Sequence, residues 1–189
     1  SYFPYKVSEE YVGNEAGTYL DDGIRKISPD GEVLFDKSVA EIFIENGLKY
    51  LLFAIHGHEL ESDPIHLNDI EPVNYDGKFW KKGDLFLSLG HQSMILLYRP
   101  STNEIIWKKT GDFFHQHDID IISETKISFF DNNSIYTHKG SIVENSNEIL
   151  IYDFETDRFN NYLNQSILDN DIRTISQGVH KINKDGNLF

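Results

Sequence analysis

The side chains best suited to chemistry are two histidines, His115 and His117, in the stretch of residues 113–133. An imidazole can attack an electrophile or shuttle a proton when one ring nitrogen is unprotonated and a hydrogen bond holds the other. The same ring can also ligate a metal, or simply bond to a neighbouring backbone group at the end of a strand. The residues alone leave these interpretations of His117 open.

A metal site is the first alternative, because imidazole is a common zinc and copper ligand. Five histidines could contribute to one: His66, His91, His115, His117 and His180. No His-x-x-x-His spacing occurs, however, and no carboxylate motif accompanies His115-Gln-His117. Asp131-Asn132-Asn133 lacks the longer acidic ladder of calcium loops, so turn capping is the better interpretation. We therefore expect neither a metal nor a cofactor.

The stretch that holds His117 is expected to form a strand, a turn at residues 123–125 and a second strand at 126–130. Side chains alternate between the two faces of an extended strand. This alternation places His117 on one face with Ile119, and Asp118 on the other. Asp131-Asn132-Asn133 would then end the second strand through side-chain-to-backbone hydrogen bonds.

The first third of the chain combines a hairpin with one helix candidate. Residues 23–28 and 32–36 flank the turn sequence Pro29-Asp30-Gly31. Residues 38–47 have helical apolar spacing, with Ser38 as the N-cap and Gly47 as the stop, although a strand is the alternative. Residues 48–55 are a strand-sized apolar run. The polar loop that follows contains His56 and His58, which we expect to be solvated.

The rest of the chain repeats one pattern of short strands and turns. A first set of strands is expected at residues 65–73, 83–89, 93–98 and 104–108. A second set is expected at residues 113–122, 126–130, 148–154 and 158–162, with a polar insertion at 134–147. A further copy begins with a strand at residues 174–182 and a turn at 183–186.

Four-stranded antiparallel units that repeat in this way are typical of a β-propeller, whose blades bury their faces against their neighbours. We therefore predict an all-β chain that forms a partial β-propeller as a single domain over residues 1–189. Its approximate blades would be residues 18–62, 63–112, 113–165 and 166–189, the last one truncated. A β-sandwich is the competing architecture, because its strands have similar spacing. Since the last expected strand has only just begun at the end, we expect the chain to be a piece of a longer protein.

Composition limits the partners. The formal net charge of -14 repels phosphate backbones, so nucleic acid is not an expected partner. The absence of cysteine excludes disulfides and thiolate metal ligands. No apolar run reaches the roughly 18 residues of a transmembrane helix, and no signal peptide is recognisable. The oligomeric state stays open.

Several short motifs stand out in the last two thirds of the chain. They are His66-Leu-Asn-Asp-Ile, Gly83-Asp-Leu-Phe-Leu-Ser-Leu-Gly-His-Gln-Ser, Ile106-Trp107 before Thr110-Gly111, Gln116-His117-Asp118 and Phe130-Asp131-Asn132. Together, over about residues 63–189, they resemble the arylsulfotransferase family and its uncharacterised relatives. The resemblance implies a six-bladed propeller in the parent protein. It also implies transfer of a sulfuryl group between phenolic compounds through a sulfated histidine, without a nucleotide cofactor.

The resemblance also assigns roles to residues. His117 would be the nucleophile, and His66 would bind sulfate or shuttle a proton. We expect Asn68, Asp69, His91, Asp118 and His180 to bind the substrate in the polar centre of the propeller. The ligand would be a small aryl sulfate or a phenol, and the location would be extracytoplasmic, in the periplasm or cell envelope. The alternative for His66, Asn68 and Asp69 is polar lining of a central channel.

One position departs from the family pattern. The resemblance implies an arginine directly before His91-Gln-Ser, where this chain has Gly90. An arginine fork grips two oxygens of a transferring group, and loss of such a group commonly costs about two to three orders of magnitude in rate. Positive charge would then have to come from His66, His91, His117 or Arg173. A propeller that binds ligands or proteins without catalysis is therefore the main alternative, and a carbohydrate-binding or hydrolysing propeller is a third.

The large aromatic residues have a simpler interpretation. We expect Trp80, Trp107 and the Phe129-Phe130 pair to pack between blades rather than to form a platform for aryl substrates.

Overall fold

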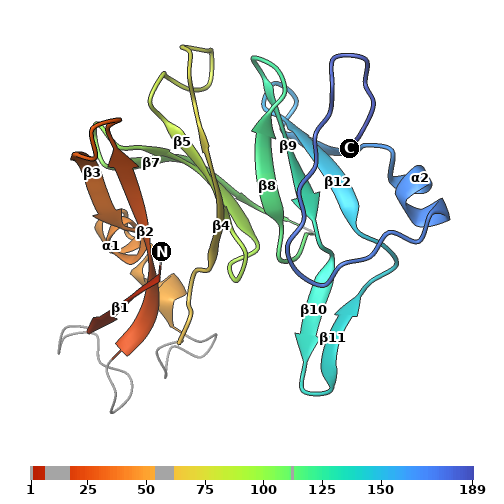
Figure 1. Ribbon diagram of the computed structural model, residues 1–189, viewed down its shortest axis with the longest axis horizontal. Helices are drawn as coiled ribbons and strands as arrows, with labels where there is room; N and C mark the ends of the chain where they lie inside the picture. Colours follow the sequence, from red (N-terminus) through yellow and green to blue (C-terminus); the bar gives the residue numbers. More distant parts are fainter. Residues whose placement is uncertain (1, 7–17, 54–61, 112) are drawn as a thin grey trace. The chain divides into compact units, whose positions relative to one another are not determined.

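The computed structural model describes residues 2–6, 18–53, 62–111 and 113–189 (Figure 1). The chain divides into two compact units, Ser1–His66 and Leu67–Phe189. Antiparallel sheets dominate both units, so the all-β prediction is confirmed. The expectation for His56 and His58 lies outside the described residues. None of the described helices has the length and apolar composition needed to cross a bilayer.

The first unit contains an antiparallel sheet in the order β1-β2-β3, formed by Tyr2–Lys6, Thr18–Ile27 and Val33–Ser38. The predicted hairpin around Gly31 is confirmed, since β2 pairs with β3 across it. Helix α1, Val39–Glu45, follows directly. Its N-cap is Ser38, whose Oγ accepts the N–H of Glu41 at 3.0 Å, so the helix prediction is confirmed over the strand alternative.

The strand-sized apolar run at residues 48–55 is described only as far as residue 53, and within it Lys49–Leu52 forms the 3-10 helix η2 instead of a strand. Leu48 and Leu52 are both buried, while Tyr50 between them is exposed. A spacing of four residues matches a helical turn rather than a strand, and η2 contacts α1. Lys49–Leu52 therefore forms a helical turn that packs against α1.

The second unit holds two four-stranded antiparallel sheets. The first has the order β4-β5-β6-β7, from Leu67–Pro72, Leu85–Leu89, Met94–Arg99 and Glu104–Thr110. The second has the order β13-β12-β9-β8, from Arg158–Asn161, Glu148–Asp153, Lys126–Asp131 and His117–Ile121. All eight strands expected in the two sets are confirmed within a few residues. The predicted insertion forms a hairpin, β10 Ser134–Thr137 and β11 Gly140–Val143.

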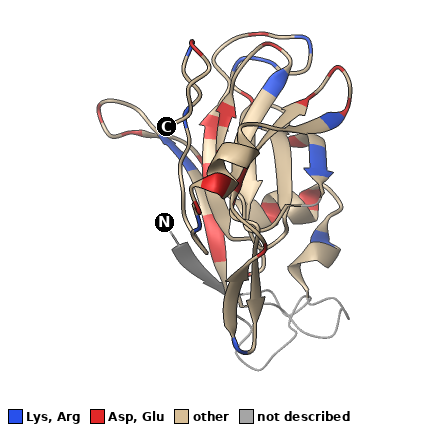
Figure 2. Cartoon of the chain, turned by 90° about the vertical axis from the view of Figure 1, so that its right-hand side faces the viewer, with Lys and Arg blue, Asp and Glu red and all other residues tan. Residues whose placement is uncertain are grey.

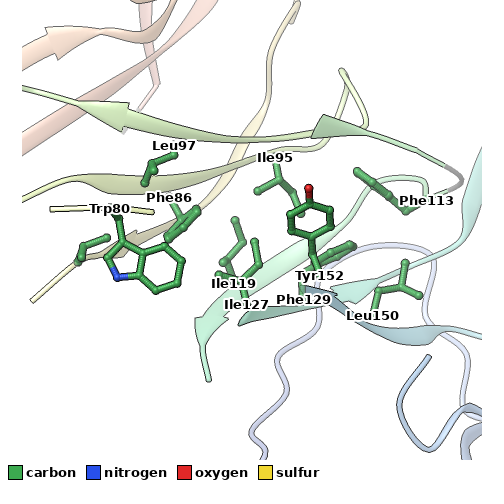
Figure 3. Close-up of a cluster of buried hydrophobic side chains, with 11 residues drawn as sticks. Trp80, Phe86, Ile95, Leu97, Phe113, Ile119, Ile127, Phe129, Leu150 and Tyr152 are labelled. Carbon is green, nitrogen blue, oxygen red and sulfur yellow. The ribbon is translucent and has the colours of Figure 1, made fainter. Parts of the chain in front are cut away.

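A hydrophobic cluster joins these two sheets (Figure 3). Phe86 and Ile95 come from the first sheet, and Ile127 and Phe129 come from the second. Trp80 lies in the connection between β4 and β5, and its ring packs edge-on against Phe86 at 5.5 Å between centroids. Interdigitation of this kind is what holds two sheets face to face.

The prediction of inter-sheet packing is confirmed for Trp80, Trp107 and Phe129, which belong to this cluster or pack against it. Phe130 contributes its ring to a second cluster, next to Ile182 and Leu188. That ring packs with Ile149 and Ile167 on the other face of the second sheet. Successive residues of one strand point to opposite faces, so adjacent phenylalanines cannot both enter one core.

The predicted strand at residues 174–182 is also wrong. The bridge between Ile182 and Leu188 is isolated, and helix α2, Asn164–Asp169, precedes this part of the chain. The turn at 183–186 is confirmed by the hydrogen bond from Gly186 N to Asn183 O at 3.0 Å. Residues 174–181, called here the C-terminal segment, run beside the second sheet (Figure 1). Side chains of that sheet and of the loops around it bind the backbone of this segment. The segment therefore stays in place without pairing to another strand.

Candidate functional site

His117 is the first residue of β8, and a β-bulge at Asp118 determines where its side chain points. His117 pairs with Phe130 and Ile119 pairs with Phe129, so Asp118 is the extra residue. Asp118 has a positive φ of 53°, as does His115 on the other side of His117, at 55°. Adjacent residues of β9 point to opposite faces, so His117 and Ile119 also do. The predicted alternation, which put these two side chains on one face and Asp118 on the other, is therefore wrong.

The bulge divides the second sheet into two faces. The core face packs in the inter-sheet cluster and comprises Ile119, Ile127, Phe129, Leu150 and Tyr152. The segment face binds the C-terminal segment and comprises His117, Asp118, Ser128, Phe130 and Asn132.

The half-buried His117 ring has hydrogen-bond partners at both nitrogens. Nδ1 lies 2.8 Å from the carbonyl oxygen of His115 and 2.7 Å from Oδ1 of Asn132. Nε2 accepts the backbone N–H of Gln177 at 3.3 Å. A carbonyl oxygen only accepts, and a backbone N–H only donates, so Nδ1 carries the proton and Nε2 carries the lone pair. His117 thus has one nitrogen held by hydrogen bonds and one that is unprotonated, as a nucleophile requires. Its contacts with backbone groups also fit the alternative, in which the ring only bonds to its neighbours.

Asn132 was not singled out by the sequence as a site residue. It is 0% exposed, and its Nδ2 donates to the carbonyl oxygens of Thr174 at 3.2 Å and Gln177 at 2.7 Å. Two carbonyl partners identify the nitrogen end of this amide, so the oxygen end faces His117. The Phe130-Asp131-Asn132 motif was the available signal, but a turn-capping role accounted for it.

Asp131 does have the predicted capping role. Its Oδ1 accepts the backbone N–H groups of Phe114 at 2.9 Å and Asn133 at 2.8 Å, directly after the end of β9. Burial raises the pKa of this carboxyl to about 7, although the two hydrogen bonds oppose the shift and the nearby Glu148 adds to it. The Asp131 carboxyl therefore fixes the backbone at Phe114, next to His115, and at Asn133, next to Asn132.

Asp118 and His180, both expected to bind substrate, bind each other. His180 is 4% exposed, its Nδ1 lies 2.9 Å from Oδ2 of Asp118, and its Nε2 lies 2.7 Å from Oγ of Ser128. Burial alone would raise the pKa of Asp118, but the hydrogen bonds from the side chain and backbone of His180 lower it below the usual value. The connectivity is that of a Ser-His-Asp triad. Because Ser128 is 0% exposed, the three residues anchor the C-terminal segment instead of presenting a nucleophile.

Gly178 allows this segment to approach the sheet closely. Its φ is +134°, and a Cβ at this position would lie 2.6 Å from Cε1 of Phe130. Only glycine combines this backbone conformation with the space available.

Asn68 and Asp69 bind the backbone next to His117. Nδ2 of Asn68 donates to the carbonyl oxygen of Gln116 at 2.9 Å, and Oδ2 of Asp69 accepts the N–H of Ile119 at 2.8 Å. Burial raises the pKa of Asp69, and the neighbouring charges of Asp118 and Asp120 raise it further. Asn68 and Asp69 thus link the first strands of the two sheets. Asp69 is one of many acidic residues in the chain, and such residues occupy several strand segments in Figure 2.

Gln116, the residue before His117, is fully buried and ties the β8 strand to the β5–β6 turn. Its Nε2 donates to the carbonyl oxygens of Leu89 at 3.2 Å and Met94 at 2.9 Å. Gly90, the position where the resemblance implies an arginine, follows Leu89 directly in this turn. The glutamine of the Gln-His motif therefore holds the residue before His117 against the β5–β6 turn.

His91 lies in the same turn and contacts His115 rather than His117 among the rings described. The His91 and His115 rings meet edge-to-face at 5.4 Å between centroids, and His115 meets Tyr136 in the same way at 4.4 Å. Arg173, the arginine considered as a source of positive charge, forms an ion pair with Asp171 at 2.7 Å.

His66 is the last residue of the first unit. Its φ is 58°, and its Nδ1 lies 2.7 Å from Oδ2 of Asp63. A carboxylate partner at Nδ1 is suited to orienting the ring.

One group of possible metal ligands lies on the segment face. The ligand atoms of Asp118, Asp120 and His180 all lie within 4.8 Å of one another. Asp120 pairs with Nζ of Lys181 at 2.6 Å, and Asp118 pairs with His180. The ligand atoms of Asp118, Asp120 and His180 therefore already have partners within the protein.

Comparison with known proteins gives one clear result. A family model described as Arylsulfotransferase (ASST) matches residues 5–189, which is nearly the whole chain. No curated protein matches the sequence.

Proposed function

The chain belongs to the arylsulfotransferase family, and we propose that it transfers a sulfuryl group between phenolic compounds through His117. The observation that carries this proposal is the state of the His117 ring within a chain that matches the family over residues 5–189. Nδ1 is held by oxygen acceptors, and Nε2 faces a donor and is therefore unprotonated. A nucleophilic imidazole needs this combination.

The proposed reaction has two steps. The lone pair of His117 Nε2 attacks the sulfur of an aryl sulfate, an N–S bond forms, and the bond between sulfur and the aryl oxygen breaks. The phenolate leaves and takes up a proton. An acceptor phenol then loses its proton as its oxygen attacks the sulfur, and the N–S bond breaks to restore the histidine. Neither step involves oxidation or reduction.

Release of Nε2 is a requirement of this scheme. The backbone N–H of Gln177 occupies the lone pair in the structure, at 3.3 Å. This is a long hydrogen bond to an exposed residue, so a small shift of the C-terminal segment frees the nitrogen. The more strongly held Nδ1 side of the ring would stay in place.

His66 completes the proposal as the residue that binds sulfate or shuttles a proton. Its support is the family resemblance and its carboxylate partner Asp63, which orients the ring. The roles of Asn68, Asp69, His91, Asp118 and His180 in substrate binding remain predictions. For Asn68, Asp69, Asp118 and His180, the contacts described above favour a role in positioning the β8 backbone and the C-terminal segment.

We also propose that the two four-stranded sheets are blades of a β-propeller, six-bladed in the parent protein. Each sheet has its strands in meander order, and the cluster of Trp80, Phe86 and Phe129 lies between their faces. The first strands, β4 and β8, lie next to each other. These features fit blades that pack around a common axis. The extracytoplasmic location belongs to the same proposal and rests on the family alone.

The test is the intact mass of the protein after incubation with an aryl sulfate. We expect a gain of one sulfuryl group that is absent in His117→Ala and that disappears when a phenol acceptor is added. His115→Ala is the matched control, since it removes a neighbouring imidazole but keeps the backbone carbonyl that binds His117. A gain that persists in His117→Ala would reject His117 as the nucleophile.

A family member that binds aryl compounds without catalysis is the second candidate. Gly90, in place of the arginine that would grip two sulfuryl oxygens, favours it, and Arg173 is paired with Asp171. Saturable binding of a phenol in a titration calorimeter, together with no mass gain from an aryl sulfate, would select this candidate.

A further inference from the structure

We infer that Asn132 is a positioning residue that fixes the tautomer of His117 and the place of its two ring nitrogens. This inference deepens the proposed function and rests on it for its catalytic consequence. Its structural content, the tautomer, does not depend on catalysis.

The hydrogen bonds of the Asn132 amide fix its direction. Nδ2 has two carbonyl acceptors, Thr174 O and Gln177 O, which cannot donate. Turning the amide over would place Oδ1 against both of them. The oxygen is therefore fixed toward His117 Nδ1, at 2.7 Å.

Hydrogen bonds also support the backbone around Asn132. The carbonyl oxygen of Asn132 accepts a hydrogen bond from Nδ2 of the buried Asn147, at 2.6 Å. Asn147 also binds Thr174 through Nδ2 at 2.9 Å and accepts its N–H at 2.6 Å. Both asparagines are 0% exposed, where an unmade hydrogen bond is costly. The amide of Asn132 therefore has one well-defined position.

The amide of Asn132 is connected to both nitrogens of His117. Oδ1 acts directly on Nδ1, while Nδ2 holds Gln177, whose N–H points at Nε2. A single side chain thus favours the proton on Nδ1 and the lone pair on Nε2. The carbonyl oxygen of His115 is a second acceptor for Nδ1, and it comes from a residue with φ of 55° in the loop that precedes β8.

An amide differs from a carboxylate in this position. Asn132 is a neutral acceptor, so it orients the imidazole without adding a negative charge that would favour the protonated ring. An unprotonated Nε2 is what the proposed attack on sulfur requires.

The test measures the tautomer directly. His117 is observed by long-range proton–nitrogen NMR in protein labelled with nitrogen-15, at about pH 8.5, where an ordinary imidazole is neutral. Its signals are assigned by their absence in His117→Ala. We expect protonated Nδ1 in the wild type and a marked rise of the Nε2-protonated form in Asn132→Leu, which removes the oxygen acceptor. Ser134→Ala is the matched control, because it removes a hydrogen bond to Ile175 O of the same segment but does not touch His117.

Kinetics give the second readout. In Asn132→Leu we expect kcat for sulfuryl transfer to fall about 10- to 100-fold with little change in KM, the scale seen when a partner that orients a histidine is removed.

Two results would overturn the inference. One is a wild-type His117 protonated on Nε2, a measurement that does not depend on whether any variant folds. The other is an unchanged nitrogen pattern in Asn132→Leu, which would mean that the His115 carbonyl alone fixes the tautomer. If the protein transfers no sulfuryl group at all, the proposed function fails, and the NMR result still decides the role of Asn132.

Discussion

The two faces of the β8–β9–β12–β13 sheet are built from alternate residues of the same strands, yet they do different work. On the core face, Ile127, Phe129 and Tyr152 pack into a cluster that also contains residues of the first sheet. On the segment face, His117, Ser128 and Asn132 bind the C-terminal segment through directed hydrogen bonds. The core face excludes water without fixing any atom in particular, whereas the segment face fixes particular atoms.

This difference explains where a reactive side chain can be held. Apolar packing is non-directional, so it stabilises the sheet but cannot choose between two nitrogens of an imidazole. Hydrogen bonds with defined donors and acceptors can do so. The bulge at Asp118 is the device that moves His117 out of the core-face register and into contact with such partners.

The largest effect is expected on the core face. Phe129 is 0% exposed and lies 5.1 Å from the Phe113 ring, centroid to centroid. Phe129→Ala should lower the free energy of unfolding by about 3 to 5 kcal/mol, through lost burial and a cavity. Urea denaturation measures the change. Phe130→Ala, on the segment face, is the matched comparison and should cost less, because Phe130 packs in a smaller cluster. Equal costs would mean that the two faces contribute alike to stability.

A second effect, of intermediate size, is expected where β9 ends. The buried Asp131 has a pKa raised to about 7, so the folded state binds its proton more tightly than the unfolded state does. Its stabilising contribution is fully present below the unfolded pKa, near 3.8, and is lost as the pH rises through 7. Within this window stability should fall by roughly 1 kcal/mol per pH unit. Asp131→Asn should abolish this part of the pH dependence and stabilise the protein above pH 7.

Denaturation at several pH values between 4 and 8 tests this prediction, with the wild type and Asp131→Asn compared at each pH. The asparagine keeps Oδ1, the atom that accepts both backbone N–H groups, so the loops should stay in place. Glu148→Gln is the control, because it removes a like charge that adds to the shift and should reduce the slope only in part. Parallel curves for the wild type and Asp131→Asn would contradict the assignment of the titration to Asp131.

The core face was largely predictable from the sequence. Apolar strands such as those containing Phe86, Ile95 and Phe129 are recognisable from their composition and from the spacing of the turns between them. All eight strands of the two four-stranded sheets were predicted within a few residues. The N-cap at Ser38 was also predictable, because the residues that signal it lie within one turn of the helix.

The segment face was not predictable to the same degree. Strict alternation put His117 beside Ile119, and nothing in the local sequence marks Asp118 as a bulge with φ of 53°. The contacts of Asn132 and Asp118 reach residues 42 to 62 positions away in the chain, to Thr174, Gln177 and His180. The family resemblance pointed to His117 as a candidate. Asn132 was overlooked, because an asparagine after a strand is so often explained by a turn.

The smallest of the expected effects separates anchoring from core packing. Ser128→Ala, on the segment face, removes the hydroxyl partner of His180 Nε2 and leaves a nearly buried nitrogen unsatisfied, at a cost of about 1 to 3 kcal/mol. The loss should be local, because Asp118 still holds Nδ1 and the backbone N–H of His180. Hydrogen exchange should therefore quicken in residues 174–181 while the amides of β9 and β12 stay protected. Ser141→Ala, in the exposed hairpin strand β11, is the control for loss of a serine hydroxyl away from His180. If exchange quickens equally across the whole sheet in Ser128→Ala, the hydroxyl supports the core as much as the segment, and the distinction between the two faces fails at this residue.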